Sequence, residues 1–444
     1  MGGATIVSDL VLAGAVVAIP AMLLFAVAGT RWPALAVCLI PLSFPIEQLD
    51  LAGLPLRVVQ LAALGVIGLV AIHQRIAHRP FLPRSALLFA VALVVLSALV
   101  STVVSVDPAA ALRLDAGYLL GLALAATIAV ACPDQRSLRL VVACTCAVGT
   151  VICAAGLTSA TQLRSHYGGS VVDNRATGFF GQPNELGAFA AIMVVLSLAL
   201  LFSSRRGSTR LLSAASVLVS AAALVVSLSR GSWLGVGLGL AVLALLAPVF
   251  RRPIVRGLVA VLAGATVAAV ALPASPLVSI VVDRAMSLVD GRRNPYDDRP
   301  AIWREALRQI AQRPALGSGP GGYPVLALRS PSQVTTVAPN HAHDLALTLT
   351  AEQGVLGLVA LGIAVSVAVL AVVRTLRWHH ARPAAGRGTG ERELLAGTAA
   401  ALAVVLGQGL LDYPLRNPVL ATTVWLLVGL LAAAVSGRDR PPEP

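Results

Sequence analysis

Long apolar segments separated by short polar breaks make up most of the 444-residue chain. They run approximately over residues 10–29, 33–45, 57–72, 85–106, 116–131, 138–157, 185–202, 211–228, 232–249, 255–273, 355–373, 394–411 and 418–436. All but the second are about long enough to cross ~30 Å of hydrocarbon as a helix. Backbone polar groups inside a bilayer must find partners within their own segment, which favours helices. The pattern therefore predicts an all-α, polytopic integral membrane helix bundle of about 12–13 transmembrane helices.

Composition supports a membrane protein and excludes several chemistries. Hydrophobic residues make up 57% of the chain and charged residues only 12%, against about 25% charged in soluble domains. All 33 basic residues are arginines, and the net charge is +13. Because lysine is absent, a Schiff-base lysine and a P-loop lysine are excluded. The arginines are spread over short breaks between apolar segments, so we expect no nucleic-acid partner.

Arginines gather in alternate loops from residue 73 to the C-terminus. These loops carry Arg75, Arg79, Arg84, Arg136, Arg139, Arg205, Arg206, Arg210, Arg251, Arg252, Arg256, Arg374, Arg377, Arg382, Arg387 and Arg392, and the tail adds Arg438 and Arg440. Short arginine-rich loops stay in the cytoplasm. We therefore expect a multi-pass protein of the cell (inner or cytoplasmic) membrane, with a cytoplasmic tail at 437–444. The long polar segment 274–343 is then extracytoplasmic.

The extracytoplasmic segment contains one amphipathic pattern. Asp297 and Asp298 suit a helix N-cap, and Pro300 suits the first turn. An apolar stripe follows at Ile302, Trp303, Ala306, Leu307 and Ile310, with Arg304, Arg308 and Arg313 off the stripe. The pattern predicts a helix that lies on the membrane or caps the bundle. An ordinary surface helix fits the same pattern and stays open.

A glycine-rich run at Gly317–Gly322 matches the spacing G-x-G-x-x-G. A dinucleotide site needs this spacing between a strand and a helix. No strand pattern precedes the run here, so the run predicts a turn.

Four polar clusters lie on the predicted extracytoplasmic side. The first holds Arg175, Asn184 and Glu185 at the start of a span. The second is Ser229–Ser232, with Arg230, between two spans, and the third is Asp297–Arg304, with Arg299 at the start of the amphipathic helix. The fourth is Pro339–Asp344, with His341 and His343. Each cluster also has a purely structural interpretation. These are, in order, a helix cap, a tight turn with a snorkelling arginine, a capped surface helix, and loop histidines without a role.

Together the clusters suit a substrate that carries phosphate. Residues 274–340 include eight arginines against five acidic residues. Guanidinium groups bind phosphate bidentately, and an imidazole titrates near neutral pH as a general base requires. H-x-H can bind metal, but no further residue of ligand spacing lies nearby in the sequence, so we expect no metal and no cofactor. Membrane-borne donors of this description are polyprenyl-diphosphate-linked sugars.

The residues in these clusters resemble the O-antigen ligase family, which shares a core domain with O-antigen polymerases and bacterial O-linked oligosaccharyltransferases. The matching pieces are Arg175-x-x-Gly178-Phe-x-x-x-Pro183-Asn184, Ser229-Arg230-Gly231, Arg299-x-x-x-Trp303, the glycine-rich run that ends at Tyr323, His341-Ala-His343-Asp344, Glu352-x-Gly354 and Asp412-Tyr-Pro-Leu-Arg416. We therefore expect N-terminal transmembrane helices over 1–169. The O-antigen ligase-like core would follow over 170–436 and include the loop 274–343.

The resemblance implies an all-helical membrane glycosyltransferase that works without a metal. It would move a glycan from an undecaprenyl-diphosphate-linked donor to a hydroxyl acceptor at the extracytoplasmic face. By position, His343 resembles the family's base, with His341 beside it, and Arg175, Arg230 and Arg299 resemble its diphosphate-binding arginines. The supporting residues are Asn184, Trp303, Asp344, Asp412 and Arg416, and Asp344 stands where family members often have Asn. The implied partners are the lipid-linked donor, membrane lipid, and a glycan, lipid or protein acceptor.

Several functions stay open at this point. A ligase uses lipid A-core as acceptor, a polymerase of the same family uses another repeat unit, and an oligosaccharyltransferase uses a protein. A transporter or flippase of lipid-linked sugars is a different class, although no internal repeat is visible and the polar residues gather at one face. A non-catalytic partner in an envelope complex is the third class.

Overall fold

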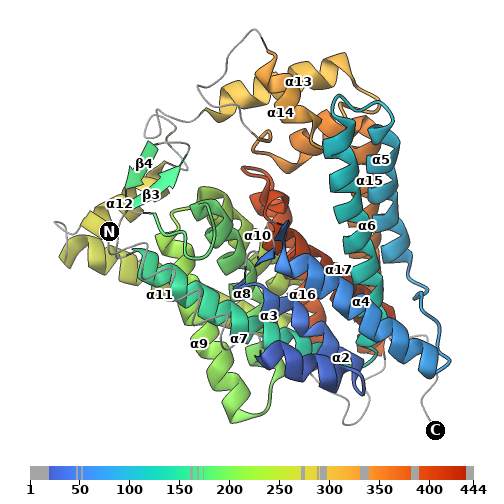
Figure 1. Cartoon of the computed structure of the whole chain (residues 1–444). Coiled ribbons are helices and arrows are strands. Elements are labelled where there is room, and N and C mark those ends of the chain that lie inside the picture. The colour runs from blue at the N-terminus through green and yellow to red at the C-terminus, as the bar shows by residue number, and fades with distance from the viewer. Residues whose placement is uncertain are drawn as a thin grey trace.

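The computed structural model describes residues 20–46, 49–51, 54–160, 164–167, 170–173, 175–271, 276–287, 290, 298–330, 340–381 and 390–436. The expected tail at 437–444, the first part of the expected span 10–29, and Asp297 lie outside the described residues. Within the described residues the protein is built almost entirely of helices (Figure 1). The predicted fold class is therefore confirmed.

Within the part of the chain that the structure describes, seven helices are long and apolar enough to cross a bilayer. They are α4 (Val58–Ile76), α6 (Pro108–Ala131), α7 (Gln135–Ala160), α8 (Pro183–Ser203), α9 (Gly207–Val226), α15 (Leu345–Ala381) and α17 (Pro418–Ser436). Shorter apolar helices include Pro20–Gly29, α5 (Ala86–Thr102) and α10 (Arg230–Leu246). The chain is thus a multi-pass helical membrane protein, and the expected number of crossings stays a prediction.

The remaining elements are α2 (Pro33–Val37), α3 (Leu39–Ser43), α11 (Arg251–Ala271), α12 (Pro276–Met286), α13 (Arg299–Gln312), α14 (Gly322–Leu328), α16 (Gly390–Gln408) and the short 3-10 turns η1 (Pro248–Phe250) and η3 (Pro414–Arg416). The short expected span 33–45 folds as two five-residue helices joined at Cys38. Two antiparallel hairpins, which the sequence did not predict, pair β1 (Leu49–Leu51) with β2 (Leu54–Leu56) and β3 (Arg164–Tyr167) with β4 (Ser170–Asp173).

Helix α8 forms the centre of the bundle. Of its membrane-length window 83% is buried, because α9, α10 and α16 pack around it. Small residues allow the neighbouring pair α10 and α16 to approach closely. A Cβ on Gly235 of α10 would lie 2.7 Å from the Val404 carbonyl oxygen of α16. The start of α8, the start of α10 and the end of α16 consequently meet at one end of the bundle.

Helix α15 begins ten residues before the expected span 355–373 and bends at Gly354. Gly354 has φ 67°, in the left-handed region that favours glycine. The Val355 N–H that the bend frees donates to the Pro314 carbonyl oxygen at 2.8 Å. The predicted glycine turn at Gly317–Gly322 packs against this bend, since the Gly319 N–H donates to the Glu352 carbonyl at 2.9 Å. The first turns of α15 are therefore clamped to residues 314–319.

The expected amphipathic helix is α13, which lies with α14 over one end of the bundle in Figure 1. Its buried face differs in part from the predicted stripe. Ile302 and Ala306 are buried as expected, but Leu307 is 54% exposed, and Glu305 is buried in its place. Glu305 tolerates burial because it accepts two hydrogen bonds from Arg308 and one from Gln309. The side chain of the expected N-cap Asp298 makes no capping bond.

Candidate functional site

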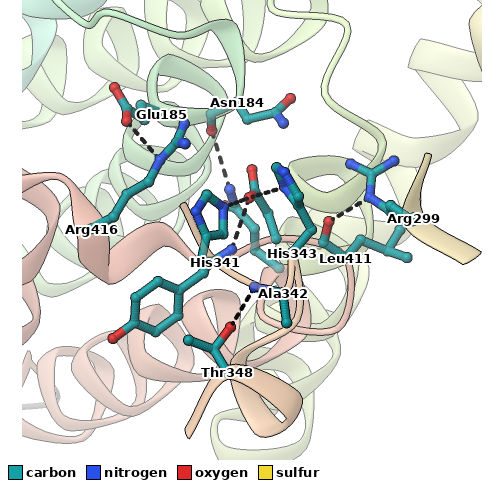
Figure 2. A network of polar contacts seen from close by, with 12 residues as sticks. Asn184, Glu185, Arg299, His341, Ala342, His343, Thr348, Leu411 and Arg416 are labelled. Atoms are coloured by element: carbon teal, nitrogen blue, oxygen red, sulfur yellow. Dashed lines mark hydrogen bonds and ion pairs between the residues drawn. The ribbon is translucent and has the colours of Figure 1, made fainter. Parts of the chain in front are cut away.

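A carboxylate from the loop between α16 and α17 holds two histidines. His341 Nε2 lies 3.3 Å and His343 Nδ1 3.1 Å from the same oxygen, Asp412 Oδ1 (Figure 2). An ionised carboxylate only accepts, so both rings donate through these nitrogens. The Tyr413 N–H donates to the same oxygen at 2.8 Å. This leaves the neutral His343 ring with its lone pair on Nε2.

Local backbone geometry at the start of α15 positions the histidines. His343 has φ 51°, which is uncommon for a residue other than glycine and is found more often at functional sites. Asp344 Oδ1 then accepts from the Leu347 N–H at 2.8 Å and so caps α15. The Leu345 N–H donates to the Gly409 carbonyl at the end of α16. Asp344 therefore supports the helix that follows His343, while Asp412 is the hydrogen-bond partner of His343 itself.

Burial and hydrogen bonding act in opposite directions on these groups. Burial lowers the pKa of His341 to about 4, against the opposing effect of its bond to Asp412. Burial alone raises the pKa of Asp412, but the hydrogen bonds from His341 and His343 outweigh it and hold that pKa well below its usual range. At neutral pH the site therefore contains an ionised Asp412 and a neutral His341.

Arg299, at the start of α13, lies beside this cluster. Its Nε donates to the Leu411 carbonyl at 3.0 Å, one residue before Asp412. Figure 2 shows this contact on the His343 side of the cluster. Trp303 follows Arg299 by four residues, so the two share a face of α13. The buried indole N–H of Trp303 has no hydrogen-bond partner among the described residues.

Arg175 is connected to the cluster through two amides. Its Nη2 donates to Asn184 Oδ1 at 2.6 Å and its Nε to the Ser227 carbonyl at 3.0 Å. The Asn184 carbonyl in turn accepts from Gln408 Nε2, four residues before Asp412. Arg175 and the histidine cluster are therefore joined through the end of α16.

Arg230 begins α10 and faces a different neighbour. Its Nη1 donates to the Ser287 carbonyl, after α12, at 3.2 Å. The adjacent Gly231 packs against the end of α16, where an added Cβ would lie 3.4 Å from the Leu411 Cβ. Arg230 is thus near the cluster in the fold, although no hydrogen bond connects its side chain to Asp412 or the histidines.

Arg416 and Glu185 form an ion pair on the other side of His341. Arg416 Nε lies 3.1 Å from Glu185 Oε1, and Asn417 Nδ2 donates to Glu185 Oε2 at 3.1 Å. The positive charge of Arg416 contributes to the lowered pKa of His341. The pair ties the first turn of α8 to η3.

The contacts of His341, His343, Arg299, Asn184 and Glu185 described above all end on one segment, 408–417, which runs from the last residue of α16 to the start of α17. Sequence reasoning named Asp412 and Arg416 as supporting residues and missed Gln408, which no motif contained. Glu185 was noticed only as part of a helix start, and its pairing with Arg416 had no signal in the sequence because the two are 231 residues apart.

His341, His343 and Asp412 also offer three metal-ligand atoms within 4.8 Å of one another. The sequence-based reason for expecting no metal, that no third ligand lies near H-x-H, therefore does not hold. The two histidine-to-carboxylate distances equally suit direct hydrogen bonds. Metal independence stays a prediction.

A family model described as O-antigen ligase matches residues 214–362. This match supports the family that the sequence motifs resemble and a membrane enzyme of the O-antigen ligase and polymerase type. Arg230, Arg299, His341 and His343 fall within the matched residues, whereas Arg175 and Asp412 lie outside them. No curated protein matches the chain.

Proposed function

We propose that the protein transfers a glycan from an undecaprenyl-diphosphate-linked donor to a hydroxyl acceptor at the extracytoplasmic face of the cell membrane. The observation that carries this proposal is the His343–Asp412 hydrogen bond beside the Arg299–Leu411 contact. It brings a general base and a phosphate-binding cation within reach of one substrate.

In the proposed reaction the acceptor oxygen attacks the anomeric carbon of the donor sugar. A new C–O bond forms, and the bond from that carbon to the diphosphate oxygen breaks. The electron pair of the broken bond stays on the departing diphosphate. The acceptor proton moves to His343 Nε2, since Nδ1 is held by Asp412. Asp412 then stabilises the imidazolium that results.

Arg175, Arg230 and Arg299 bind the diphosphate in this proposal. In Arg175 and Arg299, Nε is anchored to a backbone carbonyl, which fixes the plane of the guanidinium. A fixed fork loses less entropy when it binds phosphate and needs no reorganisation as negative charge develops. The start of α10 adds the positive end of a helix dipole beside Arg230.

The supporting residues act through these groups. Asn184 orients Arg175, Asp344 caps the helix that follows His343, and Arg416 with Glu185 braces the segment that carries Asp412. We assign Trp303 to contact with a sugar, because it shares the α13 face of Arg299 and its indole N–H has no hydrogen-bond partner among the described residues. His341 acts as a neighbour that fixes the Asp412 carboxylate.

The proposed orientation rests on the alternating arginine loops, with the C-terminus cytoplasmic. The histidine cluster then faces outward, as does the loop 274–343. We also propose that residues 170–436 form the catalytic core and that 1–169 form a supporting set of transmembrane helices. Cysteine labelling from either side of sealed vesicles at Ser85 (cytoplasmic) and Leu328 (extracytoplasmic) tests the orientation.

The test of the function uses the purified full chain in lipid nanodiscs. It is incubated with labelled undecaprenyl-diphosphate glycan and with lipid A-core, a second repeat unit, or an acceptor protein. We expect acceptor-dependent transfer, which His343→Ala abolishes without affecting membrane insertion. The acceptor that is used separates ligase, polymerase and oligosaccharyltransferase.

Two results would refute the proposal. Transfer at the wild-type rate in His343→Ala and in Arg175→Ala, Arg230→Ala and Arg299→Ala would exclude the assigned site. Movement of donor across sealed vesicles without any product would instead favour a transporter of lipid-linked sugars.

A further inference from the structure

Arg284 lies in α12, a helix that no sequence pattern singled out. Its Nε donates to the Leu228 carbonyl at 3.0 Å, in the corner between α9 and α10. Leu228 has φ 51°, an uncommon conformation for this residue type. The chain therefore holds this carbonyl toward α12 at a conformational cost, which is typical of functional sites.

The same corner already holds two of the arginines assigned to the diphosphate. Arg175 Nε donates to the Ser227 carbonyl, one residue before Leu228, and Arg230 begins α10 two residues after it. Arg230 Nη1 also donates to the Ser287 carbonyl, three residues after Arg284. Two bonds in opposite directions thus hold α12 against the corner. The guanidinium groups of Arg175 and Arg284 bind neighbouring carbonyls, those of Ser227 and Leu228.

Arg284 also shares its mode of anchoring with the assigned arginines. Arg175, Arg284 and Arg299 each use Nε to bind a backbone carbonyl, at 3.0 Å in every case. This contact fixes the guanidinium plane. Arginines outside the site use the same contact, since Arg251 Nε donates to the Ala244 carbonyl at 3.0 Å and Arg392 Nε to the Leu246 carbonyl at 3.1 Å. The position of Arg284 beside the anchors of Arg175 and Arg230 is therefore what relates it to the site.

We propose that Arg284 is a further diphosphate-binding residue, which α12 delivers to the corner formed by Ser227, Leu228 and Arg230. The inference rests on the proposed function and names an additional contact for the same substrate. When the sugar leaves, the diphosphate gains negative charge, and an anchored cation next to Arg230 stabilises that charge. Arg284 thereby serves both donor binding and departure of the leaving group.

The experiment compares Arg284→Gln and Arg284→Lys with the wild type, all as full chains in nanodiscs. Arg256→Ala is the control, because it removes one arginine from the exposed face of α11, away from the corner. Binding of undecaprenyl diphosphate is measured directly, and glycan transfer is measured over a range of donor and acceptor concentrations.

We expect Arg284→Gln to weaken binding of undecaprenyl diphosphate about tenfold or more, the usual effect of losing a charged hydrogen bond. The KM for the donor should rise and kcat should fall, while the KM for the acceptor stays at its wild-type value. Arg284→Lys should recover part of the binding, since it keeps the charge without the planar fork. The control should match the wild type.

Three results would overturn the inference. The first is binding of undecaprenyl diphosphate by Arg284→Gln that equals binding by the control. The second is an equal rise in the donor and acceptor KM values, as a folding defect would produce. The third is a lower thermal stability of Arg284→Gln, together with wild-type stability but still weakened diphosphate binding in Arg284→Lys. A wild type that binds the diphosphate but transfers nothing refutes the proposed function alone, and the binding comparison still decides Arg284.

Discussion

His343 and Asp412 are 69 residues apart in the chain, yet His343 Nδ1 donates to Asp412 Oδ1 across 3.1 Å. The same oxygen accepts from His341 and from the Tyr413 N–H, so the carboxylate has little freedom to rotate. Because Nδ1 of His343 is occupied, its basic nitrogen is Nε2. Asp412 therefore determines which nitrogen of His343 can accept a proton.

Asp412→Asn keeps the size of the side chain but removes its charge. We expect kcat for glycan transfer to fall about a hundredfold or more, because the imidazolium loses its stabilising carboxylate and the ring is free to change tautomer. Single-turnover assays with labelled donor measure this, and the KM for the donor should change little.

Asp107→Asn is the matched control for that substitution. Asp107 caps α6 through the Ala110 N–H, and asparagine caps a helix equally well. Equal rates in Asp412→Asn and this control would contradict the role of the carboxylate.

Stability should depend on pH through His341. Burial lowers its pKa from 6.5 to about 4. Between these values the unfolded chain binds a proton at His341 that the folded chain does not bind, so the folded state loses stability as pH falls from 6.5 toward 4. Thermal unfolding between pH 7 and 4.5 should show this decline, and His341→Gln should make it shallower. His78→Asn, at an exposed position, should keep the wild-type slope.

Gly354 should tolerate no side chain. Its φ of 67° disfavours other residues, and a Cβ there would overlap the Ala315 carbonyl oxygen. We expect Gly354→Ala to cost about 1–3 kcal/mol or more in the free energy of unfolding. Gly362→Ala, in the same helix with open space around it, should be neutral or slightly stabilising. A similar melting temperature for both variants would argue against the kink.

The Arg416–Glu185 pair should show strong coupling. Both side chains are largely buried, at 18% and 10% exposure, so removing either partner leaves a buried charge unpaired. We expect Arg416→Ala or Glu185→Ala to cost about 3 kcal/mol each in unfolding free energy. The double variant should cost clearly less than the sum, as a double-mutant cycle measures. Additive losses would mean that the two side chains stabilise the fold independently.

Glycan transfer should survive removal of divalent metal. The histidines already have a hydrogen-bond acceptor in Asp412, so a metal is not needed to hold the rings. We expect protein treated with a strong chelator to keep its rate, with His343→Ala as the inactive reference. Loss of activity on chelation, restored by Zn²⁺, would instead assign His341, His343 and Asp412 as a metal centre.

Prediction from sequence worked best where a local rule determined the outcome. Most helices fell close to their expected ranges because backbone groups in lipid must be satisfied within each segment. The exceptions are α15, which begins ten residues early, and the span 33–45, which folds as two short helices. Apolar periodicity, a different local rule, failed on α13, because it placed Leu307 in the buried stripe. Partners from Arg308 and Gln309 allowed Glu305 to be buried there instead. Such compensation depends on side-chain geometry that a hydrophobic pattern does not contain.

The sequence by itself determined the membrane class, the helix positions, and a set of arginines and histidines suited to a phosphate-bearing substrate. Only the tertiary structure decided which of them meet. Gln408, Asp412 and Arg416 bond to residues 69 to 231 positions away, because α8, α10 and α16 pack closely through small residues and bring their ends together. Contacts of this kind follow from packing between distant helices, and no local periodicity or spacing encodes them.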